Sequence, residues 1–254
     1  MPEPNYNEND IAFLNAIEEH HFWYRTRRHL LRTLLRDVSP QLPAAPAILD
    51  LGCGNGSMVS TIREYGTYVG IEYAREAAAN CRAKGVPALV GDARRIPLRT
   101  DSMDVVTILD LLEHVDDDRA VLEECSRVLR PGGFLLVMVP AFMALWTSFD
   151  EYSFHKRRYS RGRLSRLLRD SGFVPARKGY MFSFLFPVLL FNSLLERIRP
   201  GKPDRGQGWR RRLAPPRPGV NGLLCTLGRL ETMFMRRGLV PFGTTFLAIC
   251  RNVK

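Results

Sequence analysis

The chain has 254 residues, of which 45% are hydrophobic, so it can bury a full core as one large domain or as one domain with an insertion. Its five cysteines include no Cys-x-x-Cys pair, which argues against a structural zinc site and a disulfide framework. The formal net charge of +11 at pH 7 indicates an acidic partner, either an anionic membrane, a phosphorylated substrate or nucleic acid.

The amino-terminal part of the chain is predicted to be helical. Its first ten residues are acidic and polar, unlike a signal or transit peptide, so we expect a cytoplasmic protein. Two prolines within residues 39–43 mark a linker, and we expect residues 1–44 to form a helical cap. Apolar residues recur at helical spacing over residues 8–38, among them Phe13, Leu14, Ile17, Leu30, Leu31, Leu34 and Leu35.

A glycine-rich turn follows the first predicted strand. The apolar residues 48–51 indicate a buried parallel strand, and residues 57–64 indicate the helix after the turn. Gly52, Gly54 and Gly56 allow the backbone to turn sharply and leave room for a ligand. A strand, a glycine-rich turn and a helix form the place where α/β proteins hold nucleotide-like ligands.

The residues around this turn favour a cationic ligand over a dinucleotide. The dinucleotide fingerprint Gly-x-Gly-x-x-Gly needs glycine at position 57, where this chain has Ser57. Asp50 places a carboxylate at the strand end, where it would repel a pyrophosphate and attract the sulfonium and ammonium groups of S-adenosylmethionine. An NAD-dependent oxidoreductase is therefore a less favoured alternative.

Further strands follow at regular intervals. Residues 67–72 end at Glu72, 18 positions after Gly54, close to the spacing of about 20 at which an acidic residue binds ribose hydroxyls. Residues 86–90 and 104–109 are the third and fourth predicted strands, and residues 134–139 are the fifth. A helix stop and strand start at residues 172–175 and an alternating segment at residues 243–250 complete the predicted sheet.

Five motifs now stand in order along the chain, namely DLGCGNG, GIEYA, GDA, LDLLEHV and LRPGGFLLVMVP. Together they resemble the motifs of the class I S-adenosylmethionine-dependent methyltransferases of the small-molecule type, over about residues 45–180 and again at the final strand. The resemblance implies an α/β fold with a doubly wound, mostly parallel, seven-stranded Rossmann-like sheet. The helical spacing of residues 8–38 adds amino-terminal helices. In this family the last two strands usually form a nearby antiparallel pair, whereas about 60 residues separate them here, which predicts a helical insertion before the last strand.

The resemblance assigns residues to S-adenosylmethionine. It implies that the turn glycines pass the methionine moiety and that the acid ending the second strand binds the ribose. The Asp-Ala pair after the third strand would flank the adenine, and the end of the fourth strand would cover the cofactor. Residues 21–25 resemble an aromatic and basic patch that caps the cofactor in related enzymes. The predicted cofactor site comprises Asp50, Gly52, Gly54, Glu72, Asp92, Ala93, Leu109 and Arg25.

Two histidines are candidates for the catalytic base. Methyl transfer is an in-line displacement, so the enzyme positions the acceptor and can remove its proton. His155 lies in a polar and aromatic loop after the fifth strand and is our first choice, while His114 after the fourth strand is the second. Each could instead make only a structural hydrogen bond. We expect the acceptor side to be lined by Trp146, Arg158 and Tyr159.

A metal site is the less favoured interpretation of the segment after the fourth strand. Asp110, Glu113 and His114 would share one face of a helical turn and could hold a divalent ion. The segment resembles the acid-x-x-Glu-His pattern of the ubiquinone-pathway O-methyltransferases. The same Asp-x-x-Glu spacing is typical of a capping box at a helix start. We therefore expect no metal cofactor.

The segment between the last two strands combines apolar and basic residues. Residues 181–195 are apolar on every face but shorter than the roughly 20 residues of a spanning helix, and Pro187 interrupts them. Eight Lys and Arg residues follow within positions 197–217. The segment is either a strand end with a helix over the active site, or an interfacial helix whose basic loop meets anionic lipid. Nucleic acid fits less well, because Trp209 is the only aromatic residue interleaved in the basic run.

These observations predict four regions and a function. Residues 45–180 form the S-adenosylmethionine-binding core, residues 181–241 a lid or membrane-surface insertion, and residues 242–254 the final strand. We expect methyl transfer to an oxygen, less favourably to a nitrogen or carbon, of a small or lipid-linked metabolite. The protein would lie peripherally on the inner membrane face if the insertion binds lipid. The alternative is an inactive, cofactor-binding membrane-surface module, and the oligomeric state stays open.

Overall fold

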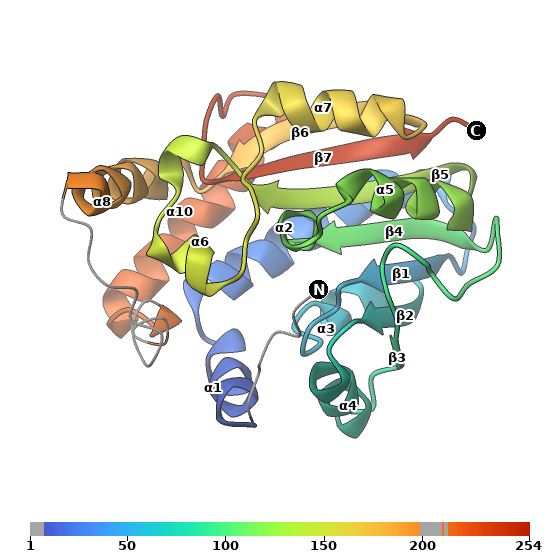
Figure 1. Cartoon of the computed structure of the whole chain (residues 1–254), viewed down its shortest axis with the longest axis horizontal. Coiled ribbons are helices and arrows are strands. Elements are labelled where there is room, and N and C mark those ends of the chain that lie inside the picture. Colours follow the sequence, from blue (N-terminus) through green and yellow to red (C-terminus); the bar gives the residue numbers. More distant parts are fainter. Residues whose placement is uncertain (1–7, 199–209, 211–212) are drawn as a thin grey trace.

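A seven-stranded sheet forms the centre of the molecule (Figure 1). The structure is a computed structural model that describes residues 8–198, 210 and 213–254. The strands lie in the order β3-β2-β1-β4-β5-β7-β6, with β1 to β5 paired in parallel and β7 antiparallel to β5 and β6. This arrangement confirms the predicted fold. The bounds are β1 (Ala47–Leu51), β2 (Thr67–Glu72), β3 (Ala88–Val90), β4 (Met103–Leu109), β5 (Leu129–Pro140), β6 (Phe173–Met181) and β7 (Thr245–Asn252).

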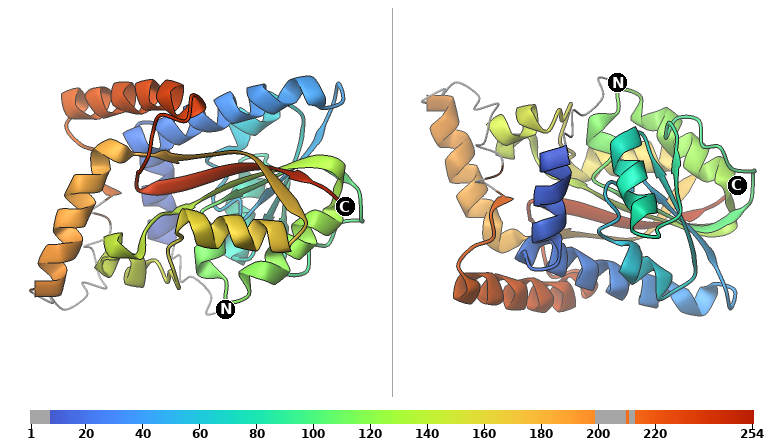
Figure 2. Two further views of the ribbon diagram at one scale, coloured as in Figure 1. Left: turned by 90° about the horizontal axis from the view of Figure 1, so that it is seen from above. Right: turned by 90° about the horizontal axis from the view of Figure 1, so that it is seen from below.

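Helices cover both faces of the sheet, with α2 and α10 on one face and α5 and α7 on the other (Figure 2). Short 3-10 turns join several elements, at η1 (Ser39–Gln41), η2 (Leu112–His114), η3 (Met143–Leu145) and η4 (Ser183–Leu185). The helices are α1 (Glu8–Glu18), α2 (Phe22–Val38), α3 (Val59–Arg63), α4 (Arg75–Ala83), α5 (Asp118–Val128), α6 (Ser148–Tyr152), α7 (Arg161–Asp170), α8 (Phe186–Ile198) and α10 (Pro218–Arg236).

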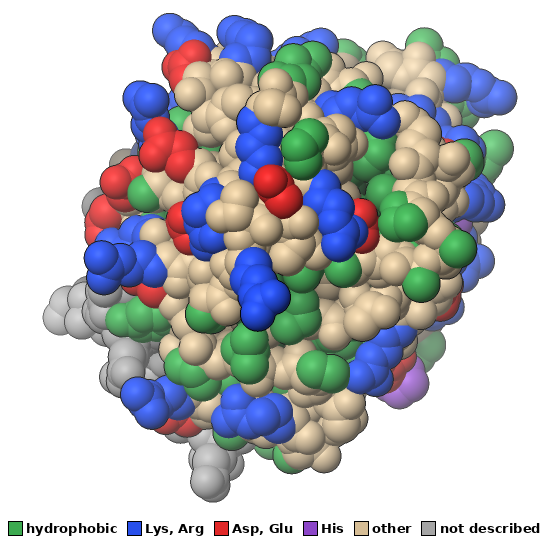
Figure 3. Space-filling view, turned by 90° about the vertical axis from the view of Figure 1, so that its right-hand side faces the viewer, with side chains coloured by type: hydrophobic (Ala, Val, Ile, Leu, Met, Phe, Trp, Pro, Cys, Tyr) green, Lys and Arg blue, Asp and Glu red, His purple; other side chains and the backbone are tan. Residues whose placement is uncertain are grey.

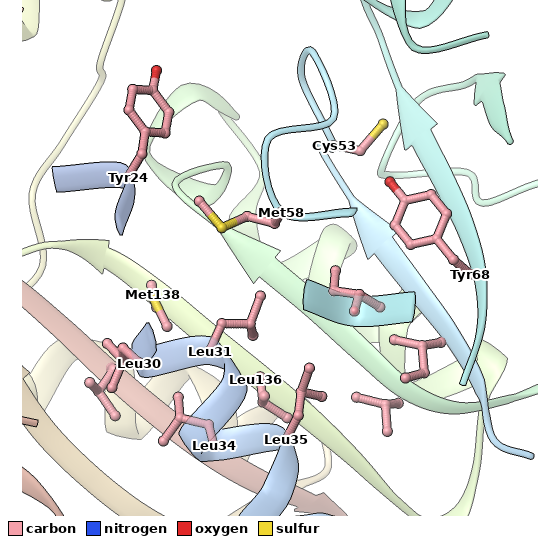
Figure 4. Close-up of a cluster of buried hydrophobic side chains, with 14 of the residues drawn as sticks. Tyr24, Leu30, Leu31, Leu34, Leu35, Cys53, Met58, Tyr68, Leu136 and Met138 are labelled. Carbon is pink, nitrogen blue, oxygen red and sulfur yellow. The ribbon is translucent and has the colours of Figure 1, made fainter. Parts of the chain in front are cut away.

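Helix α2 fills one side of the core because its apolar residues recur at helical spacing. Leu30, Leu31, Leu34 and Leu35 are buried against sheet residues such as Leu136 (Figure 4). Complete burial of one such side chain stabilises a fold by about 1.5–3 kcal/mol. The opposite face is buried in the same way under α5 and α7. The amino-terminal cap predicted at residues 1–44 is thus packed onto the core sheet through α2.

The predicted helix over residues 8–38 is interrupted at residues 19–21. His21 ends the break and caps α2, because its Nδ1 accepts a hydrogen bond from the backbone N–H of Trp23 (3.1 Å). The side chain of Asn221 in α10 then fixes the break, accepting from the N–H of Phe22 and donating to the carbonyl of His20, both at 2.8 Å. The amino-terminal helices and the insertion before the last strand are therefore joined.

Strands β5 and β3 begin at residues other than the predicted ones, and in β5 the residues of an expected turn take part in strand pairing. The fifth strand was expected to begin at Phe134, after a Pro-Gly-Gly turn, but β5 begins at Leu129. The register against β4 shifts between Met103 and Val105, and Gly132 adopts a φ of +76°. An irregularity of this kind, with glycine at a positive φ, lets pairing continue through a kink. Strand β3 is shorter than expected and begins after Pro87.

The residues between β6 and β7 contain α8 and α10. The last two strands pair directly, with Met181 opposite Thr245, although a long segment separates them in the sequence. Helix α8 lies beyond the carboxyl ends of the parallel strands, and α10 lies alongside α2 (Figures 1 and 2). In the described residues, no helix is both long enough and apolar enough to cross a bilayer. The basic stretch at residues 199–209 and 211–212 lies outside the described residues.

Candidate functional site

A cavity of about 1500 Å³ opens at the carboxyl ends of β1 and β4. Its walls include the amino-terminal helices, the strand ends, the loops after β4 and β5, and residues 213, 214, 216, 244 and 245. Helix α8 closes another side with Leu189, Asn192 and Leu195. The strand order reverses between β1 and β4, and such a switch point is where open α/β sheets bind ligands.

The glycine-rich turn lies on the floor of this cavity. Gly52 and Gly54 both have positive φ values, +77° and +55°, which side-chain-bearing residues rarely adopt. A Cβ atom at Gly52 would come within 3.1 Å of Leu111 Cδ1. Nothing lies within 4 Å of the equivalent position at Gly54, so the backbone there is open to a ligand. Both predicted glycines are thus placed where the turn needs them.

Glu72 joins the first two predicted motifs. Its Oε2 accepts a hydrogen bond from the N–H of Gly54 (2.8 Å), and its Oε1 accepts from the N–H of Ala74 (2.9 Å). The carboxylate lines the cavity and is held in one orientation. Each oxygen retains a lone pair that could accept from a ribose hydroxyl. The ribose role of Glu72 remains a prediction, supported by this position.

Asp50 provides negative charge beneath the turn. Its side chain is 2% exposed, and it accepts hydrogen bonds from Thr107 Oγ1 (2.7 Å) and Tyr68 Oη (3.3 Å). Burial raises the pKa of Asp50 to about 6, against the opposing effect of these hydrogen bonds. The carboxyl is therefore ionised at neutral pH but only moderately acidic. A bound cation would favour its ionised form.

The remaining predicted cofactor residues differ in their placement. Leu109 lines the cavity, whereas Asp92 and Ala93 do not. The hydrogen bond from Arg94 lowers the pKa of Asp92, and Ala93 is buried in the core under β4. Arg25 is exposed and points away from the cavity side of α2, which corrects the prediction. Residues two apart on a helix project about 200° from each other, so Arg27 faces the cavity instead.

A buried ionic cluster supports the acceptor side. Asp150 is fully buried and accepts from Arg158 through Nε (2.8 Å) and Nη2 (2.9 Å). Its Oδ1 lies 2.8 Å from Nδ1 of His155. Burial by itself raises the pKa of Asp150, but the hydrogen bonds from His155 and Arg158 outweigh it and hold the pKa below its usual value.

This cluster defines the state of His155. An ionised carboxylate only accepts hydrogen bonds, so Nδ1 of His155 must carry the proton that it shares with Asp150. Nε2 is then free of its proton in the neutral ring and can accept one. His155 lines the cavity, as the sequence predicted for a base. Its catalytic role remains a prediction, supported by the arrangement of an Asp and a His that general-base catalysis uses.

His114 is a weaker candidate for the base. Its ring lies edge-on to that of His155, with centroids 4.8 Å apart. Burial lowers the pKa of His114 to about 3, with a further contribution from the neighbouring His155. An imidazole with so low a pKa holds a proton poorly near neutral pH. The loop after β5, which carries His155, is held beside His114 by a hydrogen bond from the N–H of Lys156 to the carbonyl of Glu113 (2.7 Å).

The group that could bind a cation differs from the predicted one. One ligand atom from each of Glu113, His114 and His155 lies within 4.8 Å of the others. Asp110 was expected to join Glu113 and His114 but pairs with Arg27, with Nη1 and Oδ2 2.6 Å apart. The reason is local: Asp110 has a φ of +58° and precedes a 3-10 turn, so it does not share a helical face with them.

Glu113 is a functional candidate that sequence reasoning treated only as a metal ligand. It is fully buried, and neither carboxylate oxygen has a hydrogen-bond partner among the described residues. Burial, and secondarily the charge of Asp110, raise the pKa of Glu113 well above its usual value. The neutral acid can therefore donate a hydrogen bond into the cavity. A glutamate in a 3-10 turn gives no sequence signal of such burial.

Two of the three predicted acceptor residues lie outside the cavity lining. Tyr159 is fully buried, and its hydroxyl donates to Asp118 Oδ2 (2.8 Å), so its role is structural. Trp146 also lies outside the lining, while Arg158 lines the cavity and holds Asp150. The aromatic side chains that do reach the cavity include Trp23, Phe149 and Tyr152. Phe149 and Tyr152 belong to the predicted loop, but only the short helix α6 decides which of its residues face inward.

The chain is similar to known methyltransferases. The protein-family model described as "Methyltransferase domain" matches residues 49–137. A Mycolicibacterium smegmatis protein named "Probable S-adenosylmethionine-dependent methyltransferase" is 30% identical over 163 residues, covering 62% of this chain and 62% of that protein. The tRNA (carboxymethyluridine(34)-5-O)-methyltransferase ALKBH8 of Mus musculus is 30% identical over 152 residues, covering 59% and 21%. The ubiquinone biosynthesis O-methyltransferase of Xanthomonas oryzae is 34% identical over 138 residues, covering 49% and 58%.

A solved structure shows the same fold over nearly the whole chain. It is an S-adenosylmethionine-dependent methyltransferase of Thermotoga maritima, with a TM-score of 0.59, 17% identity and coverage of 96% of this chain and 95% of that one. Residues 49–137 therefore match a methyltransferase domain, the fold is that of a solved S-adenosylmethionine-dependent methyltransferase, and S-adenosylmethionine is the expected cofactor. The chain spans less than two thirds of the length of each of the three relatives.

Proposed function

We propose that the protein transfers the methyl group of S-adenosylmethionine to a hydroxyl oxygen of a small or lipid-linked acceptor, with His155 as the general base. The observation that carries this proposal is the buried hydrogen bond between Asp150 and His155 at 2.8 Å. His155 lines the same cavity as the glycine-rich turn. A cofactor site and a proton acceptor in one cavity are what O-methylation requires.

Each part of the site has one task in this mechanism. S-adenosylmethionine supplies an electrophilic methyl group on a sulfonium. Glu72 and the turn at Gly54 would hold its adenosine and methionine parts, and the carboxylate of Asp50 would favour its positive charge. Nε2 of His155 accepts the hydroxyl proton as the acceptor oxygen forms its bond to the methyl carbon. The cofactor would keep the electron pair of its carbon–sulfur bond on sulfur, and Asp150 would stabilise the imidazolium that forms when His155 takes the proton.

The choice of acceptor rests on the walls of the cavity and on the relatives. Two relatives are named as methyltransferases that act on oxygen. Leu185, Leu189 and Leu195 place apolar surface opposite the ionic cluster, which suits an acceptor with a hydroxyl at one end and an apolar body. The mouse relative is named for a tRNA substrate, so nucleic acid is tested as an acceptor below. A cytoplasmic location, peripheral to the inner membrane face, belongs to this proposal.

An acceptor panel with methyl-labelled cofactor tests the proposal. Wild-type protein is incubated with a catechol, a long-chain alkyl phenol and bulk tRNA, and the label is followed into product. We expect transfer to a phenolic oxygen, lost in His155→Ala and retained in the exposed control His20→Ala. Transfer to tRNA alone would replace the acceptor class. Tight binding of S-adenosylmethionine and its demethylated product without any transfer would favour the inactive membrane-surface module.

A further inference from the structure

Helix α8 lies beyond the carboxyl ends of the parallel strands, and α10 lies alongside α2 (Figures 1 and 2). Both helices carry exposed apolar side chains. We propose that this surface docks onto an anionic lipid bilayer, which presents the acceptor to the cavity. The second half of this statement rests on the proposed function, whereas the first does not. The surface, called the apolar rim below, consists of Val188, Phe191, Leu194, Leu195, Ile198, Val220, Leu223, Leu230, Met233, Phe234, Leu239 and Phe242.

Helix α8 turns polar side chains inward and apolar side chains outward, which is the reverse of a surface helix in a soluble protein. Its polar side chains face the protein: Ser193 Oγ lies 2.8 Å from the carbonyl oxygen of Ala144, to which it donates, and Glu196 accepts from the N–H of Ser148 (2.7 Å). Its apolar side chains face outward, with Phe191 65% exposed and Ile198 77% exposed. An ordinary surface helix buries its apolar stripe and exposes its polar one. The outer face of α8 therefore needs an apolar environment.

Helix α10 buries Cys225 and Met235 in the core and also exposes apolar side chains on its outer side. Its buried Glu231 accepts hydrogen bonds from the N–H groups of Phe182 (2.5 Å) and Ser183 (2.6 Å) at the corner that leads into α8. Leu223 is 59% exposed and Phe234 50% exposed on its outer side. Its inner face packs on α2 and β6, so the outward direction of the apolar residues is fixed by the fold. The buried carboxylate thus holds the two helices in register.

The segment after α10 connects the two helices into one surface. The rings of Phe186 in α8 and Phe242 lie 5.1 Å apart, centroid to centroid, in an edge-on contact. Leu239, three residues before Phe242, is 61% exposed. Soluble monomers rarely expose extended apolar surface, and where they do it marks a contact with a protein or a membrane.

Charge decides between these two partners. Residues 186–242 contain eleven Lys and Arg residues against three Asp and Glu residues, which accounts for eight of the eleven net positive charges of the chain. The acids Glu196 and Glu231 are occupied by backbone N–H groups, as described above. Arg217, Arg229 and Arg237 are exposed on or beside α10. Apolar residues flanked by cations are the pattern of helices that lie in the interface of anionic membranes.

A second copy of this chain would be a poorer partner. A twofold contact would bring the same basic surface of both copies together, and like charges repel. On the end of the molecule opposite α8, Lys and Arg side chains lie among Asp, Glu and hydrophobic side chains (Figure 3). Among the described residues, Arg217, Arg229 and Arg237 are exposed on or beside α10 next to its apolar side chains, and such cations complement phosphate headgroups.

Docking in this orientation would connect the bilayer with the cavity. Leu195 both lines the cavity and is 43% exposed, and Leu189 and Asn192 line the cavity from the same helix. Helix α8 is therefore the wall between the apolar rim and the reaction site. An acceptor with a lipid tail could keep the tail in the bilayer while its hydroxyl passes α8 toward His155.

Vesicle sedimentation tests the docking surface with the full chain. Vesicles of phosphatidylcholine mixed with phosphatidylglycerol should bind the protein, while pure phosphatidylcholine should bind it weakly, and salt should release it by screening. Phe191→Ser with Ile198→Ser should weaken binding about 10- to 100-fold, because two side chains no longer enter the bilayer. The matched control is Val174→Ser with Val253→Ser, which removes exposed apolar side chains elsewhere and should bind as wild type.

A charge series separates lipid attraction from apolar insertion. Each Lys or Arg near an anionic leaflet strengthens binding about fivefold, so Arg217→Gln, Arg229→Gln and Arg237→Gln together should weaken it strongly. The control Arg166→Gln with Arg169→Gln removes exposed charge from α7 and should change little. The basic positions Arg210, Arg211 and Arg212 offer a second set, although the latter two lie outside the described residues.

Two outcomes would overturn the proposal. In one, the wild type fails to sediment with anionic vesicles at low salt. In the other, light scattering shows a dimer that Phe191→Ser with Ile198→Ser dissociates, while vesicles do not bind, so that the rim is a subunit interface. The same variants are assayed with a water-soluble phenol. A rim variant that loses vesicle binding but still methylates the phenol supports the docking surface and leaves the proposed function intact. A wild type that binds vesicles but methylates no phenol contradicts the proposed function and leaves the docking surface intact.

Discussion

The cofactor side and the acceptor side of the cavity are built in different ways. On the cofactor side, glycines at positive φ shape the backbone, and Glu72 accepts the N–H of Gly54 from a partly exposed position. On the acceptor side, Asp150 is buried in an ionic cluster with Arg158 and His155. The first side depends on backbone conformation within a few residues. The second depends on side chains held together by burial.

This difference predicts where the molecule is fragile. A buried ion pair contributes little by its formation, but breaking it leaves an unpaired charge in the interior. A partly exposed carboxylate can be removed with a smaller effect on folding, because water solvates the groups that it leaves. Changes on the acceptor side should therefore affect rate and stability, and changes on the cofactor side should mainly affect cofactor affinity.

The largest expected effect is on the rate. His155→Ala removes the proposed base, so turnover should fall about 10²- to 10⁴-fold while S-adenosylmethionine affinity stays unchanged. Calorimetry and a methyl-transfer assay measure the two quantities separately. His20→Ala, which changes an exposed histidine, is the control. A variant with near-full turnover would show that His155 is not the base.

Asp150→Ala should cause the largest loss of stability. The side chain of Arg158, 6% exposed, would be left buried without its carboxylate partner. Loss of one partner from a buried pair typically lowers the free energy of unfolding by about 3–5 kcal/mol. The ion pair of Lys156 with the exposed Asp116 gives a control, and Asp116→Ala should lower stability far less than Asp150→Ala. Denaturant unfolding with equal losses for both variants would contradict the contrast between buried and exposed ion pairs.

Glu72→Ala tests the cofactor side. It removes a carboxylate that accepts the Gly54 N–H and is predicted to bind ribose hydroxyls. Hydrogen bonds to a charged group contribute about 1.5–3 kcal/mol, so affinity should drop about 10- to 100-fold with the fold retained. Glu76→Ala on the exposed side of α4 should bind as wild type. Unchanged affinity of Glu72→Ala in calorimetry would mean that Glu72 does not bind the ribose and that the motif GIEYA has been assigned wrongly.

Cofactor affinity should also depend on pH through Asp50. Its pKa of about 6 means that the carboxyl takes up a proton as the pH falls below that value, and the attraction for a cationic ligand is lost. Affinity should therefore rise with pH through about 6 and level off above it. A ligand that lowers the pKa by one unit binds the ionised form about tenfold more tightly. Asp50→Asn should give a flat profile, and an equally steep profile in that variant would assign the titration to another group.

The smallest expected effect concerns Glu113, His114 and His155, the group that could bind a cation. If Nε2 of His155 accepts the acceptor proton, it is not a metal ligand, so a chelator should leave the rate of methyl transfer unchanged. Added magnesium, manganese or zinc should likewise have no effect. Loss of activity with a chelator and its recovery with one of these ions would make Glu113, His114 and His155 a metal site. His155 would then be a ligand rather than a base.

The comparison also shows which residues a sequence can reveal. Gly52, Gly54 and Glu72 were predictable because their chemistry depends on spacing along the chain, and the structure places all three at the cavity. Arg25 was wrongly predicted to line the cofactor site. Which side of α2 faces the cavity depends on where this helix begins, and it begins only after the break capped by His21. Tyr159 was misplaced because an aromatic residue in a polar loop can equally anchor that loop from inside.

The acceptor side lay largely beyond sequence reasoning. His155 could be named as a base from its residue type and its loop, but its partner Asp150 could not, since a capping carboxylate and a buried one have the same local sequence. The burial of Glu113 depends on the loop after β5 closing over η2. Asp110 left the predicted group because its positive φ turns it toward Arg27.

The sequence alone located the strands of the core and the cofactor turn, because these follow from local periodicity, glycine positions and the spacing of acids. The class of the sheet followed from the resemblance of five motifs to a known family, and the order of the strands from the structure. The sequence also revealed that residues 181–195 are apolar and that basic residues follow. Only the tertiary structure decided which way α8 and α10 face and which ionisable groups are buried together. Those properties arise from contacts between distant segments, such as Glu231 with the corner at Phe182, and no local pattern specifies them.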